Sequence, residues 1–219
     1  TLDRVLGSVD PRRTTLGMTI HQVKFEYSYL LTLAERFGIS HLRFSIAAPN
    51  VADPSTWSID PAVDFGPLAQ RVYTFLQAAR NEALYVQSDC GYLPPCAFSD
   101  EQLRSLQEGT YRPELAFSCH GPIDIGPDGL AWRCYGLYRQ LSWTPLPISS
   151  CAHPAEMSTI FEGQVRALGL PVLFERCADC ELAQRYGCAG GCYALRLATS
   201  VRARAQREGV PFDRDEDLR

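Results

Sequence analysis

Short apolar runs alternate with longer amphipathic stretches along the first half of the chain. Residues 14–20 (TTLGMTI), 41–47 (HLRFSIA) and 83–88 (ALYVQS) carry β-branched or alternating apolar positions, which predicts three strands. Residues 24–38 have a helical pattern, and a second helix is predicted by one apolar stripe: Phe65, Leu68, Val72, Phe75, Leu76 and Ala79. Strands separated by helices favour a parallel sheet, so we expect an α/β fold with functional residues beyond the carboxyl ends of the strands.

The pattern changes near Tyr111. Residues 123–132 (IDIGPDGLAW) place two short apolar runs around a Gly-Pro-Asp-Gly turn, which predicts a β-hairpin. Residues 155–169 have a helical pattern, and a further helical stretch follows Cys192. We therefore expect two parts, residues 1–111 and residues 112–219.

Length and charge narrow the class of protein. The chain has 219 residues, which suits one large domain or two small ones. Its net charge of −4 gives no reason to expect nucleic acid or an anionic membrane surface as a partner. No apolar run is long enough to span a bilayer, and no secretion signal is visible. We expect a cytoplasmic protein.

The cysteines carry the strongest chemical signal. There are nine of them: Cys90, Cys96, Cys119, Cys134, Cys151, Cys177, Cys180, Cys188 and Cys192. In a reducing compartment such clusters indicate metal binding or catalysis more often than disulfides, and an odd number leaves one thiol over. The last four follow the spacing C-x2-C-x7-C-x3-C, and Gly190 and Gly191 allow the backbone to approach a bound group closely. Such a set of thiolates selects zinc or an iron–sulfur cluster, and the spacing alone does not separate the two.

Two cysteine elements resemble the SPASM domain of radical S-adenosylmethionine enzymes. Residues 119–134 fit its C-x(9–15)-G-x4-C element, and residues 177–192 are similar to its C-x2-C-x5-C-x3-C element with two extra residues in the middle gap. The first half resembles the later part of the partial (β/α) barrel of these enzymes. The resemblance therefore implies the C-terminal part of such a barrel, followed by a small cysteine-rich auxiliary domain with a β-hairpin and helices.

The resemblance also implies two auxiliary 4Fe–4S clusters. By matching position, the first takes Cys119, Cys134 and Cys192, and the second takes Cys177, Cys180 and Cys188. A fourth thiolate is unassigned for each cluster, because no cysteine follows Cys192. The candidates are Cys96, which we favour for the first cluster, Cys151, which could serve the second, and Cys90. An open iron site that binds a substrate group is the competing hypothesis.

One departure from the family concerns the radical chemistry. The C-x3-C-x2-C motif whose cluster cleaves S-adenosylmethionine is absent, so we expect that this chain alone does not cleave it. The N-terminal half, with the S-adenosylmethionine site, is then removed, is a separate partner chain, or is lost in a non-catalytic relative. No catalytic residue is assigned: Asp89, His21 and Arg43 lie near predicted strand ends or strands, but structural roles are more common there.

The function implied by the resemblance is electron transfer or substrate binding by the clusters during modification of a peptide or protein substrate. Two other functions stay open. One is a non-catalytic peptide-binding module stabilised by zinc or by clusters. The other is an electron-transfer subunit that serves a separate radical enzyme.

Overall fold

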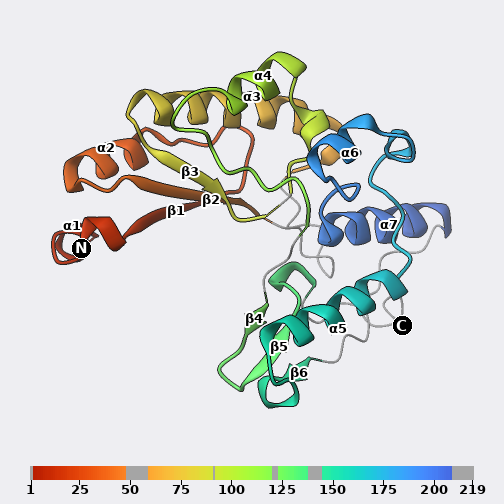
Figure 1. The fold of residues 1–219 in the computed structure, drawn as a ribbon. Helices are drawn as coiled ribbons and strands as arrows, with labels where there is room; N and C mark the ends of the chain where they lie inside the picture. Colours follow the sequence, from red (N-terminus) through yellow and green to blue (C-terminus); the bar gives the residue numbers. More distant parts are fainter. Residues whose placement is uncertain (1, 48–58, 91, 120–122, 138–144, 209–219) are drawn as a thin grey trace.

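The computed structural model describes residues 2–47, 59–90, 92–119, 123–137 and 145–208 (Figure 1). These residues form helices and two small three-stranded sheets, so the predicted α/β class is confirmed. None of the described helices is long and apolar enough to cross a bilayer.

The first sheet is parallel and contains the three predicted strands. They are β1 (Thr15–Ile20), β2 (His41–Ile46) and β3 (Tyr85–Ser88), in the order β1-β2-β3. Two helices cover one face of this sheet: α2 (Ser28–Phe37) and α3 (Pro61–Asn81) (Figure 1). The alternation seen in the sequence explains this packing, because Leu42, Phe44 and Ile46 are buried while His41 and Arg43 on the same strand are exposed.

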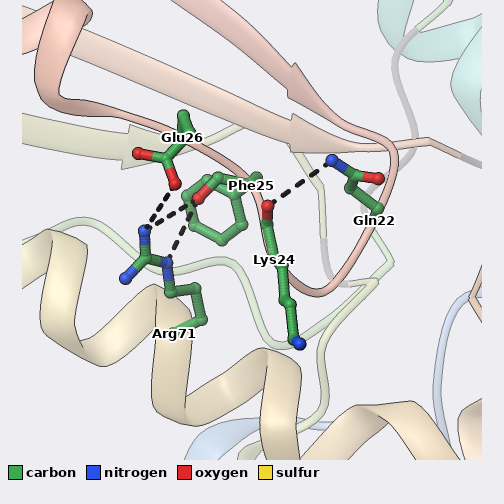
Figure 2. A network of polar contacts seen from close by, with 5 residues as sticks. All are labelled: Gln22, Lys24, Phe25, Glu26 and Arg71. Atoms are coloured by element: carbon green, nitrogen blue, oxygen red, sulfur yellow. Dashed lines mark hydrogen bonds and ion pairs between the residues drawn. The ribbon is translucent and has the colours of Figure 1, made fainter.

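Arg71 on α3 holds the loop that follows β1 through hydrogen bonds and an ion pair (Figure 2). Arg71 donates from Nε and Nη2 to the carbonyl of Phe25, both at 3.1 Å, and its Nη2 lies 3.5 Å from a Glu26 carboxylate oxygen. Its guanidinium also lies 4.9 Å from the ring centroid of Tyr27. The same loop is closed internally by Gln22, which donates to the Lys24 carbonyl at 3.4 Å. The carboxyl end of β1 is thereby held against α3.

Two short helices follow β3 in the described chain. These are the 3-10 helix η3 (Pro95–Ala97) and α4 (Asp100–Gln107). Ser99 and Gln102 form a capping box at the start of α4, as their spacing predicts. Ser99 accepts from the Gln102 amide at 3.2 Å, and Gln102 accepts from the Ser99 amide at 2.9 Å.

The second sheet is antiparallel and carries the predicted hairpin. It contains β4 (Asp124–Ile125), β5 (Leu130–Trp132) and β6 (Leu146–Pro147), and the 3-10 helix η4 (Tyr135–Leu137) follows β5. The sequence pattern did not predict β6, because two residues are too few to show a period. Helix α5 (Pro154–Ala167) lies beside this sheet (Figure 1) and forms a small core with it from Ala131, Met157 and Phe161.

Two helices complete the described chain, α6 (Glu181–Tyr186) and α7 (Tyr193–Glu208). The first turns of α7 bury Ala194, Leu195, Leu197 and Ala198 in the same core that the first sheet forms with α3. The main core thus draws on residues from both sides of position 111. The division into residues 1–111 and 112–219 stays a prediction.

Candidate metal centre

All nine cysteines are free thiols, and eight of them lie in two groups. We call Cys96, Cys177, Cys180 and Cys188 the outer thiol group, because they line one hollow that is partly open to solvent. We call Cys90, Cys119, Cys134 and Cys192 the inner thiol group, because these thiols act on one another electrostatically and Cys192 is buried.

Short helices bring the outer thiol group together. Cys177 ends the 3-10 helix η6 (Glu175–Cys177), and Cys180 is the residue before α6. Helix α6 ends at Gly187, whose φ of 66° turns the chain so that Cys188 follows at once. Helix α6 packs against η3, which contains Cys96. The seven-residue gap between Cys180 and Cys188 is therefore one short helix and its glycine cap.

Two glycines shape the floor of the outer hollow. Gly190 and Gly191 line it with φ angles of 81° and 102°, values that side-chain-bearing residues rarely adopt. A Cβ at Gly190 would lie 2.9 Å from Cγ1 of Val172, and one at Gly191 would lie 3.2 Å from Cδ2 of Leu173. The backbone beside the thiols is therefore close-packed in a way that only glycine permits.

The inner thiol group lies where the hairpin meets α7. Cys134 directly precedes η4 and Cys192 directly precedes α7, and these two helices pack together. Cys119 and Cys192 share a side-chain hydrogen bond. Cys90 and Cys134 both pack against the main core.

Protonation in the inner thiol group is uneven. The hydrogen bond from Cys192 lowers the pKa of Cys119 to about 6, and the same bond together with burial raises the pKa of Cys192 well above its usual range. Burial raises the pKa of Cys90 and of Cys134 to about 11. A bound cation would be needed to hold all four as thiolates, which metal binding does by deprotonating coordinating thiols.

Two arginines that each directly precede a cysteine donate hydrogen bonds to residues of the thiol groups. Arg133 is buried, donates to the Cys119 carbonyl at 2.9 Å and pairs with the Glu162 carboxylate. Arg176 lies at the outer thiol group, where its Nη2 is 3.8 Å from Sγ of Cys96. Neither residue was predicted from the sequence, although the repeated Arg-Cys pair at 133–134 and 176–177 was the signal available.

A third arginine joins α7 to the loops around the outer hollow. Arg196 donates to the Pro171 carbonyl at 2.7 Å, to the Ala189 carbonyl at 3.0 Å and also to the Leu170 carbonyl. These bonds tie both sides of the outer hollow to the helix that begins beside Cys192.

The structure differs from the sequence-based expectation for the unassigned thiols. Cys96, which we favoured for the first cluster, lies with Cys177, Cys180 and Cys188, because η3 packs on α6. Cys90, the remaining candidate, lies with the inner thiol group instead. Cys151 belongs to neither group, because it packs against the small core beneath α5.

The polar residues near the strands have ordinary partners. Nε of Arg43 lies 3.5 Å from a carboxylate oxygen of Asp89, and the Asp89 amide donates to the Phe44 carbonyl at 2.9 Å. These contacts are structural, so neither residue is assigned a catalytic role.

The outer hollow offers thiols and a glycine floor to a bound group. Among the described residues, no three His, Cys, Asp or Glu side chains are arranged to hold a metal ion. The outer thiols instead surround a narrow hollow whose remaining lining is apolar, including Leu173 and Phe174. Four soft donors around an apolar hollow with a glycine floor fit a thiolate-bound group in donor chemistry.

Known proteins give no further guide to this chain. Comparison with protein-family models, with curated proteins and with solved structures finds no match.

Proposed function

We propose that this chain binds two 4Fe–4S clusters, one in each thiol group, and acts as the C-terminal, auxiliary portion of a radical S-adenosylmethionine enzyme that modifies a peptide or protein. The observation that carries the proposal is the division of the nine cysteines into two groups of four, with Cys151 apart. A chain with unrelated core cysteines has no reason to gather them in two sets of the number that a 4Fe–4S cluster requires.

The ligand sets that follow differ from those of the family in one respect. Each set keeps the three cysteines that the resemblance implies and gains a fourth from residues 90–96, the segment that leaves β3. Cys90 completes the inner group and Cys96 completes the outer group. With four thiolates each, the clusters would have no iron atom left open for a substrate group, which favours electron transfer over substrate binding.

Bound clusters of this type supply one-electron transfer at a potential set by their protein surroundings. The chain's own residues exclude water and fix the thiols. Burial of Cys192 and the apolar lining of the outer hollow lower solvent access, and both groups are fastened to the main core. The fold supports the same reading, because parallel strands with helices on one face are what a part of a (β/α) barrel would present.

We propose that the radical step is carried out by residues outside this chain. No C-x3-C-x2-C motif is present, so the S-adenosylmethionine site belongs to an N-terminal half or to a partner chain. We propose that the substrate is a peptide or protein, on the resemblance alone.

The test is the metal content of protein purified without oxygen. We expect about eight iron and eight sulfide per chain and a signal from reduced clusters in the EPR spectrum. Substituting Cys180→Ala or Cys134→Ala should each remove about half of the iron, whereas Cys151→Ala should remove none. Stoichiometric zinc without sulfide would refute the cluster proposal and favour a zinc-stabilised peptide-binding module.

A further inference from the structure

The outer thiol group has an exposed arginine beside it, Arg176. Nη2 of Arg176 lies 3.8 Å from Sγ of Cys96, and the guanidinium lies 5.0 Å from the ring centroid of Phe174. Phe174 lines the outer hollow and packs edge-on against Phe65, with ring centroids 6.3 Å apart. Since Phe65 is buried on α3, the Phe174 ring under the exposed Arg176 side chain is anchored to the core.

The two thiol groups differ in how their nearby arginine is neutralised. Arg133 beside the inner group forms an ion pair with Glu162. Arg176 takes part in none of the ion pairs found among the described residues. Within the part of the chain that the structure describes, the outer group therefore lies next to a positive charge without a paired carboxylate, and the inner group lies next to a neutral pair.

This difference matters for any cluster that the thiols hold. Reduction adds one negative charge, so a cation near the sulfur ligands stabilises the reduced state and raises the potential. A guanidinium that donates to a thiolate sulfur adds a charge-assisted hydrogen bond in the same direction. It also fixes the rotamer of the thiolate that it contacts.

On this basis we propose that Arg176 is a positioning residue that holds Cys96 as the fourth ligand of the outer group and raises the reduction potential of the cluster bound there. The inference rests on the proposed function, since it needs a cluster in the outer group. It adds that one residue, Arg176, makes the reduction potential of the outer cluster higher than that of the inner cluster.

The experiment compares Arg176→Gln and Arg176→Lys with wild type in an anaerobic redox titration followed by EPR. Arg185→Gln is the matched control. The Arg185 guanidinium also lies over a nearby aromatic ring, 5.5 Å from the centroid of Tyr186, but Arg185 is not among the side chains that donate to a described thiol. Far-UV circular dichroism checks that each variant is folded.

We expect Arg176→Gln to lower the midpoint reduction potential of one cluster by at least ~59 mV. For a one-electron couple this shift corresponds to a tenfold change in the equilibrium constant. The other cluster should keep its midpoint, Arg176→Lys should shift less, and the control should match wild type. Loss of about four iron in Arg176→Gln alone would also support the proposal, through the positioning of Cys96.

Two results would overturn it in distinguishable ways. Full iron content with unchanged midpoints in Arg176→Gln would refute the role of Arg176 and leave the clusters in place. Wild-type protein without iron and sulfide would refute the proposed function itself, and the role of Arg176 with it.

Discussion

Removing the Glu162 carboxylate should destabilise the protein strongly. The Arg133 side chain is only 2 % exposed and its partner Glu162 is 31 % exposed, so Glu162→Ala leaves a buried guanidinium without its counter-charge. Breaking a buried ion pair from one side costs about 3–5 kcal/mol. Because water reaches part of Glu162, we expect the lower end, about 3 kcal/mol of the free energy of unfolding.

A second substitution tests whether this cost comes from the orphaned charge. Arg133→Met in the same chain removes the charge and also removes a buried Nε that has no hydrogen-bond partner among the described residues. It leaves the Cys119 carbonyl without the 2.9 Å bond from Arg133, which costs about 1–3 kcal/mol. The double variant should therefore be more stable than the sum of the two single variants predicts, by at least ~1.5 kcal/mol.

The assay is urea unfolding followed by far-UV circular dichroism, on wild type, both single variants and the double variant. All four proteins are purified identically and without oxygen. Effects that add to within about 0.5 kcal/mol would show that the two side chains do not interact, and would refute the ion pair as the link between the hairpin and α5.

Three further outcomes follow from local geometry and from the thiols. Gly190→Ala should lower the free energy of unfolding by about 1–3 kcal/mol, because the added Cβ is strained at positive φ and contacts Val172. Gly187→Ala is the control, because φ is 66° there but nothing lies near the added Cβ, so thermal melting should show a smaller loss. Ser99→Ala should cost about 1 kcal/mol in the same assay because the capping box is lost; an unchanged melting temperature would contradict the cap. In metal-free protein the lowered pKa of Cys119 means that its thiolate is favoured by folding, so this group adds stability that is complete above pH 9 and is lost as the pH falls through about 6. Iodoacetamide labelling should detect Cys119 before the other inner thiols, and equal labelling rates for all of them would contradict the shared hydrogen bond.

The sequence by itself determined the local elements. Apolar alternation in residues 41–46 and the stripe on residues 61–81 are decided by neighbours in the chain, so the strands of the first sheet, the longer helices and the capping box could be predicted. The hairpin was predictable for the same reason, because its turn residues are specific. The cysteine spacing likewise indicates a thiolate site, since it is a property of the chain alone.

Only the tertiary structure decided which thiols share a site. Cys96 and Cys177 are far apart in the chain, and they meet because η3 packs on α6. Cys90 is close to Cys96 in sequence but lies with Cys192 and not with the outer thiol group. The charge beside each group is equally non-local, since the partner of Arg133 comes from α5. Spacing fixes which residues can meet locally, while long-range pairing depends on how helices pack, and no pattern within one segment encodes that packing.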